Sequence, residues 1–310
     1  MRPKSRRKNK HKKSLKNIHI LTALIALILF SYFFTNLNKV ISFVNPKIFE
    51  GKLISGKSLG NIFLTPPPTS TPTLSPTLIP TATPVPLVGY CLNVPVLMYH
   101  HIQPDAEAQA RGQRALSIDS GQFDLQMSYL ISRGYSVISA KQLADALISH
   151  AGLPQKSIVV TMDDGYSDIY SYAYPILQKY HITASLMIPT GLLGGADYMS
   201  WGQLEEMVHS GLAYVIDRTW SHYAITHGSI DKIKYEIETG KQQLQDHTGQ
   251  SVDLFGYPYG AISANAIPIL RSEGFVGAFS EIPGHWQCDS FIMSLHRTRI
   301  GNASLSSYGL

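Results

Sequence analysis

The sequence predicts an α/β fold, an irregular TIM-like (β/α) barrel of about seven strands preceded by a transmembrane helix and a Pro/Thr-rich stalk. Three observations predict it: alternating strand and helix patterns after residue 93, an uncharged segment behind a basic terminus, and recurrent prolines between the two. The chain has 310 residues, of which 44% are hydrophobic and 15% charged. It can therefore bury a sizeable core, and a wholly disordered chain is excluded.

The N-terminal region is typical of a membrane anchor. Residues 1–17 contain nine Lys or Arg and no acid, and no charged residue lies between Lys16 and Lys39. A bilayer core needs roughly 20 apolar residues in a helix, so residues 18–38 suffice. The positive charges precede this segment, which predicts a cytoplasmic N-terminus and an extracytoplasmic remainder on a single-pass protein of the cell membrane. No small-x-small site follows Phe34, which favours an uncleaved anchor over a cleaved signal peptide.

The charge balance argues against nucleic acid as a partner. The formal net charge is +5, but without residues 1–17 the chain has 17 basic and 21 acidic residues. The body of the protein is therefore mildly acidic, whereas nucleic-acid-binding domains carry basic patches. A nucleic-acid arm remains the alternative interpretation of the basic tail.

A proline-rich segment separates the anchor from the rest of the chain. Residues 39–64 stay an unassigned spacer, and residues 65–88 form the predicted linker. Eight of the 22 residues from 65 to 86 are Pro, which favours extended polyproline II. At ~3.1 Å per residue such a stalk reaches up to roughly 70 Å. It would hold the predicted domain, residues 89–310, away from the membrane.

The barrel is predicted from strand and helix patterns that alternate. Phe123, Met127 and Leu130 have helical spacing, as do the apolar residues from 230 to 244. An open doubly wound sheet is the alternative, but it would have a Gly-rich phosphate turn after an early strand, and the sequence has none. The apolar runs expected as strands are residues 96–99, 135–139, 157–162, 184–189, 213–216, 253–258 and 276–280.

Polar motifs follow three of these runs, at the strand ends where barrel enzymes place their chemistry. Asp163 and Asp164 follow the third run, and one could hold a cation while the other takes a proton from bound water. A helix cap or a solvated turn explains them equally well. Arg218-Thr-Trp-Ser-His222 follows the fifth run. Phe255-Gly-Tyr-Pro-Tyr-Gly260 closes the sixth in a tight turn.

Together these residues resemble the polysaccharide deacetylase (NodB-homology) family, carbohydrate esterase family 4, in its Phe-small-Tyr-Pro-Tyr-Gly branch. The resemblance covers about residues 93–310 and includes the first strand, residues 94–100, and the Leu-His-Arg stretch, residues 295–297. It implies a metal-dependent hydrolase that removes acetyl groups from an N-acetylated cell-wall or exported polysaccharide. The implied cofactor is a divalent metal, Zn²⁺ with Co²⁺ or Ni²⁺ as alternatives.

The resemblance also implies roles for individual residues. Asp163 would be the general base and Asp164 a metal ligand, with His222 as a second ligand. The backbone N–H of Tyr259 would stabilise the oxyanion, and His296 would be the general acid. The implied substrate contacts are Tyr257, Pro258 and Trp220.

Arg218 departs from the family pattern. Aligned on the family's His-Thr-x-x-His motif, it stands where the first histidine ligand is expected. A guanidinium cannot give up its proton at neutral pH and repels a cation. In a shifted register His222 and His227 would be the ligands, but Thr219 fits the first register better. The sequence therefore predicts an active deacetylase, or else a metal-poor relative that only binds glycan. A glycosidase would need a second carboxylate, for which there is no candidate.

The two cysteines are too few for a disulfide scaffold or a multi-Cys zinc module. Cys91 precedes the first expected strand, and Cys288 follows the last. Both lie on the predicted extracytoplasmic side, where oxidation is permitted. A disulfide between them is one hypothesis, and two unpaired thiols are the alternative.

Overall fold

The computed structural model describes residues 88–310. The predicted tail, anchor and spacer, and nearly all of the linker, lie outside the described residues, so those predictions stay predictions. Within the described part of the chain, no helix has both the length and the apolar composition needed to cross a membrane.

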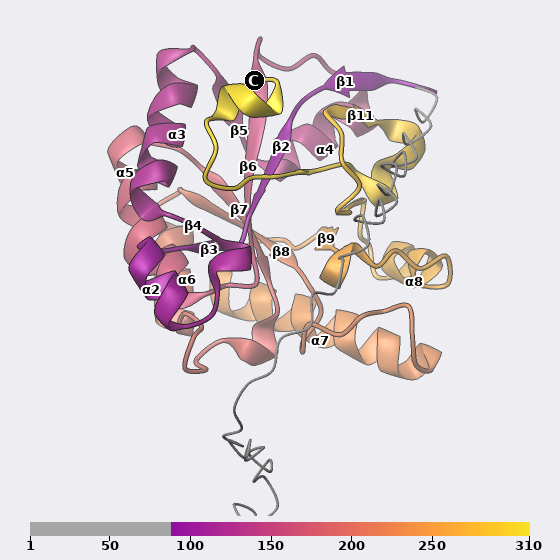
Figure 1. The fold of residues 1–310 in the computed structure, drawn as a ribbon. Helices are drawn as coiled ribbons and strands as arrows, with labels where there is room; N and C mark the ends of the chain where they lie inside the picture. Colours follow the sequence, from indigo (N-terminus) through magenta and orange to yellow (C-terminus); the bar gives the residue numbers. More distant parts are fainter. Residues whose placement is uncertain (1–87) are drawn as a thin grey trace, which may run out of the picture. The chain divides into compact units, whose positions relative to one another are not determined.

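A curled parallel sheet forms the centre of the domain (Figure 1). Its strands follow the order β10-β9-β8-β7-β6-β2-β12, and β5 pairs additionally with β6. Its central strand β6 is buried at all seven positions, which explains its continuous apolar sequence. The strands are β2 Val96–Tyr99, β5 Ser136–Ile138, β6 Ser157–Asp163, β7 Ala184–Ile188, β8 Ala213–Asp217, β9 Leu254–Gly256, β10 Gly277–Phe279 and β12 Thr298–Arg299.

The segment before β12 joins the two edges of this sheet. Leu295 makes a parallel bridge to Phe279 in β10, while Thr298 and Arg299 pair with β2. The Ser280 N–H donates to the Leu295 carbonyl, and the Leu295 N–H donates to that of Ala278. The C-terminal segment therefore brings its side chains to the end of the sheet where β6 and β8 have their carboxyl ends.

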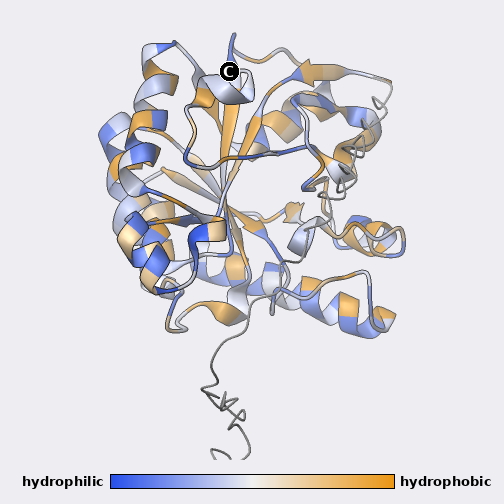
Figure 2. Cartoon of the chain, in the orientation of Figure 1, coloured by the Kyte–Doolittle hydropathy of each residue, from blue (hydrophilic) through white to orange (hydrophobic). Residues whose placement is uncertain are grey.

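Helices pack around the outside of the sheet, and in Figure 2 the strands are mainly hydrophobic while the helices carry both kinds of residue. Side-chain caps begin several helices: Ser139 and Ser200 form capping boxes, and Asp119 accepts from the backbone N–H of Gly121. The helices are α2 Asp105–Ala110, α3 Ser120–Ser132, α4 Ala140–Ser149, α5 Tyr174–Tyr180, α6 Trp201–His209, α7 Ile230–Thr248 and α8 Ala266–Ser272.

The predicted α/β class is confirmed, and each of the seven expected strands is present. The barrel prediction is confirmed only in part, because the sheet is a curled parallel half-barrel. In it β5 is off the main path, and β12 takes the edge place beside β2. Sequence patterns missed β12 because it has two residues and one of them, Arg299, is charged and exposed. Two small sheets were also missed, one of β3 His101–Ile102 with β4 Ser117–Ile118 and one of β1 Cys91–Asn93 with β11 Trp286–Cys288.

The disulfide hypothesis is confirmed. Cys91 and Cys288 are directly opposite each other in the antiparallel pair β1–β11 and are joined by a disulfide. Their Cα atoms lie 4.1 Å apart. The bond ties the start of the domain to the segment that carries the last part of the sheet.

Candidate functional site

A cavity of about 440 Å³ opens at the carboxyl ends of the parallel strands. Asp164 reaches it from the end of β6, Arg218 from the end of β8, and His100 from the end of β2. Side chains of both charge signs and several aromatic rings thus meet in one hollow. The residues that line it are His100, Leu116, Asp164, Tyr166, Leu192, Tyr198, Arg218, His222, Tyr259, Glu281 and Arg299.

The loops around the cavity contain several non-glycine residues with an unusual backbone conformation. Among residues 88–310, seven non-glycine residues have a positive φ, and four of these are Asp164, Thr219, His222 and Tyr259. The left-handed region is unfavourable for L-residues, above all for a β-branched one such as Thr219, whose φ is 63°. Such conformations concentrate where side chains must be aimed at a site. Here they turn the strand ends into the cavity.

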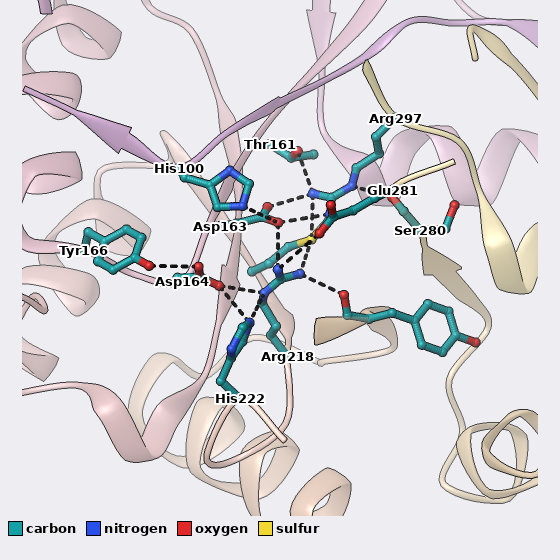
Figure 3. Close-up of polar contacts among 12 residues, drawn as sticks. His100, Thr161, Asp163, Asp164, Tyr166, Arg218, His222, Ser280, Glu281 and Arg297 are labelled. Carbon is teal, nitrogen blue, oxygen red and sulfur yellow. Dashed lines mark hydrogen bonds and ion pairs between the residues drawn. The ribbon is translucent and has the colours of Figure 1, made fainter. Parts of the chain in front are cut away.

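Asp163 is fully buried and bound by two arginines (Figure 3). Arg297 donates to both of its oxygens, from Nη1 to Oδ1 at 2.7 Å and from Nη2 to Oδ2 at 3.0 Å. Arg218 Nη2 lies 3.1 Å from Oδ2. Burial acts to raise the pKa of the Asp163 carboxyl, but the charges of Arg218 and Arg297 outweigh it and hold the pKa below its usual value. An effective general base needs a pKa near the working pH, so this environment weakens that role.

Asp164 lies beside Asp163 but borders the cavity. Its Oδ1 accepts from Arg218 Nε at 2.8 Å and lies 3.1 Å from His222 Nε2. Its Oδ2 accepts from the Tyr166 hydroxyl at 3.1 Å. Burial acts to raise the pKa of Asp164, but the bond from His222 and the charge of Arg218 hold it well below the usual value.

The guanidinium of Arg218 is the centre of this cluster, as Figure 3 shows, and the residue is only 1% exposed. Besides its bonds to the two aspartates, it donates from Nη1 to the Tyr257 carbonyl at 3.2 Å, and its Nε lies 3.2 Å from His222 Nε2. Burial acts to lower the pKa of Arg218, but Asp163 and Asp164 raise it above its usual value. Arg218 is therefore a permanent cation inside the cavity.

This arrangement does not fit a divalent metal held by Asp164 and His222. Zinc sits about 2.0–2.2 Å from its nitrogen and oxygen ligands, and a structural or catalytic site supplies at least three of them. The ligand atoms that Asp164 and His222 would offer both face Arg218 Nε, at 2.8 and 3.2 Å. The guanidinium has no lone pair to offer and lies against both of these atoms.

A second group of ligand atoms lies at the other side of Asp163. His100, Asp163 and Glu281 each offer one such atom, and the three atoms lie within 4.8 Å of one another. His100 Nε2 is 4.0 Å from Asp163 Oδ2. Burial lowers the pKa of His100, which keeps its imidazole neutral at neutral pH and able to act as a ligand.

The structure places the other predicted site residues in different surroundings. His227 is exposed and is not among the residues that line the cavity, so it does not join His222. His296 stacks on Phe291, with ring centroids 4.6 Å apart, and also lies off the cavity. Burial lowers the pKa of His296. Its neighbour Arg297 is the residue that reaches Asp163.

Some of the residues predicted to contact substrate or oxyanion line the cavity, and others do not. Tyr259 borders the cavity with 67% of its surface exposed, and its ring meets that of His222 at 4.5 Å. Tyr257 is fully buried, and its hydroxyl donates to the Met293 carbonyl at 3.0 Å. Pro258 is buried, and Trp220 packs edge-on against Tyr235. Neither of these two lines the cavity.

Sequence reasoning missed several residues of this site. His100 ends the stretch of residues 94–100 that carries part of the family resemblance, and Tyr166 follows Asp164 by two residues, which was the available signal for them. Glu281 and Arg299 follow no recognisable motif and join the cavity only through the fold. Tyr166 also stacks on Tyr198, with ring centroids 5.3 Å apart, and so forms an aromatic wall of the cavity.

Comparison with known proteins agrees with this fold. Residues 150–278 match the sequence model of the family described as polysaccharide deacetylase. Among solved structures, the chain is similar to the Streptococcus pyogenes deacetylase PplD in complex with acetate. The TM-score is 0.64 and the sequence identity 27%, covering 70% of this chain and 96% of that chain.

Curated relatives include two poly-beta-1,6-N-acetyl-D-glucosamine N-deacetylases. The chain is 26% identical over 214 residues to that of Escherichia coli (strain K12), covering 55% of this chain and 32% of the relative. It is 25% identical over 177 residues to that of Staphylococcus aureus (strain MRSA252), covering 53% and 61%. The chain thus spans less than two thirds of the length of either relative. Sequence and fold lead to one conclusion: residues 150–278 match a polysaccharide deacetylase domain, and the fold is similar to that of a solved deacetylase.

Proposed function

We propose that the domain binds an N-acetylated polysaccharide, of the poly-N-acetylglucosamine kind, in the cavity at the strand ends. The observation that carries the proposal is the lining of this cavity. Tyr166 and Tyr198 form a stacked wall, and Tyr259 presents an exposed ring beside His222. Aromatic faces bury the apolar faces of sugar rings, while nearby polar groups bind hydroxyl and amide groups. The names of the two curated relatives support this class of polymer.

Binding of N-acetylglucosamine oligomers tests the proposal. We expect calorimetry on the full chain to detect binding of a β-1,6-linked oligomer, and Tyr198→Ala to weaken it about 10-fold, since loss of one stacked ring costs about 1–1.5 kcal/mol. Tyr235→Ala is the control, because this tyrosine is exposed but does not line the cavity. Equal loss in both variants, or no binding by the unmodified protein, would refute the proposal.

A second candidate function is N-deacetylation by this chain itself. The observation that favours it is the convergence of His100, Asp163 and Glu281. These residues would hold a divalent metal, which would supply polarisation of the acetyl carbonyl. Acetate release from the same oligomer distinguishes the candidates. Release that needs added zinc and disappears in His100→Ala would establish hydrolysis, whereas we expect none above background.

The location of the domain outside the membrane is also a proposal. The basic run and the uncharged segment up to residue 38 support it, and the disulfide agrees with an oxidising compartment. Protease added to intact cells should remove the domain if it is extracytoplasmic. Full protection in intact cells, with digestion after lysis, would contradict this location.

A further inference from the structure

We infer that the Arg218 guanidinium is a built-in cation that takes the place of a divalent metal, so that the glycan site of this chain is complete without one. This deepens the proposed function, on which its glycan-binding part rests. Binding of glycan without a metal is then a property of this sequence.

The contacts of Arg218 are those expected of a site-organising cation. It reaches Asp163 at 3.1 Å, Asp164 at 2.8 Å and the Tyr257 carbonyl at 3.2 Å. These partners come from the ends of β6 and β9, while Arg218 itself follows β8. One buried side chain therefore connects the ends of three strands of the same sheet, a task that a metal ion performs by coordination.

The charges around Arg218 also favour a site without a metal ion. Asp163 and Asp164 are buried and Glu281 is partly exposed, and all three have an oxygen within 4.0 Å of Arg218. Arg297 pairs with Asp163. Buried carboxylates are strongly unfavourable unless they are paired. Without Arg218, Asp163 would keep Arg297 as a partner, but Asp164 would lose its bond to a guanidinium. With Arg218 in place, a divalent cation would be repelled by a fixed positive charge that contacts both aspartates.

The loop that carries Arg218 is held in place from outside the cavity. Glu236 of α7 has a fully buried side chain and accepts from both the backbone N–H and the hydroxyl of Ser221, at 2.8 and 2.7 Å. The Trp220 N–H donates to the Glu236 carbonyl at 2.8 Å. Thr219 Oγ1 accepts from the Tyr223 N–H at 2.8 Å. These bonds anchor residues 219–223, so Arg218 is positioned by the fold and is not a surface side chain that has folded inward.

Zinc binding to the full chain tests the inference independently of activity. After treatment with EDTA and dialysis, we expect the unmodified protein to bind no stoichiometric zinc. Arg218→His removes the cation and adds an imidazole ligand beside Asp164 and His222, so it should bind one zinc at least about 100-fold more tightly. Arg218→His/His222→Ala should lose that gain. Arg299→His is the matched control, because Arg299 lines the cavity but contacts neither aspartate, and it should bind no zinc.

Two results would overturn the inference. One is stoichiometric zinc binding by the unmodified protein that is lost in Asp164→Asn. This measurement does not depend on whether the Arg218 variants fold. The other is loss of oligomer binding by the unmodified protein when EDTA is present. Absence of oligomer binding both with and without EDTA would instead refute the proposed function, and the zinc titration would still decide the role of Arg218.

Discussion

Arg297→Met should destabilise the domain by about 3–5 kcal/mol, the cost of removing one partner from a buried ion pair. Arg297 is 0% exposed, and its guanidinium makes two bonds to Asp163, one to the Ser280 carbonyl and one to Thr161 Oγ1. Methionine keeps much of the volume but offers none of these donors. Asp163 would be left buried with Arg218 as its remaining close guanidinium. Urea unfolding of the full chain, followed by tryptophan fluorescence, measures the loss.

Arg299→Met is the control for this experiment. Arg299 lies two residues further along the same segment but is exposed, so we expect a change within about 0.5 kcal/mol. The double variant Asp163→Asn/Arg297→Met should be less destabilised than the sum of the two single variants, because the unpaired charge is gone. Equal effects of Arg297→Met and Arg299→Met would show that the pair with Asp163 does not stabilise this fold.

Cys91→Ser/Cys288→Ser should lower the free energy of unfolding by about 2–5 kcal/mol. The disulfide closes a loop with a sequence separation of 197, so its removal greatly enlarges the unfolded ensemble. It also joins β1 to β11, a two-stranded sheet that is marginal without a covalent link. The midpoint of urea unfolding under oxidising conditions gives the effect.

Reduction of the unmodified protein provides the control. Addition of dithiothreitol should bring its unfolding midpoint to that of the serine variant and leave the variant itself unchanged. An unmodified protein whose midpoint is insensitive to reductant, with two titratable thiols after unfolding, would show that the bond does not form.

The local sequence determined the α/β class and the strands that support the site. The apolar run ending at Met162 predicted a buried strand with the aspartates at its end, and β6 is buried at all seven positions. The position of Arg218 close to His222 was also predictable, since the two residues lie within a motif of five consecutive residues. Such local features depend on residues that are close in the sequence, so their spacing can be read from it directly.

The tertiary structure decided which side chains meet. His296 and Arg297 are adjacent in the sequence, but Arg297 pairs with Asp163 while His296 stacks on Phe291 away from the cavity. His222 joins Asp164 because a left-handed turn redirects the loop, and His227, five residues on, stays exposed. Arg297 and Asp163 are 134 residues apart. A contact across that distance depends on the closure of the whole sheet, which local spacing does not encode.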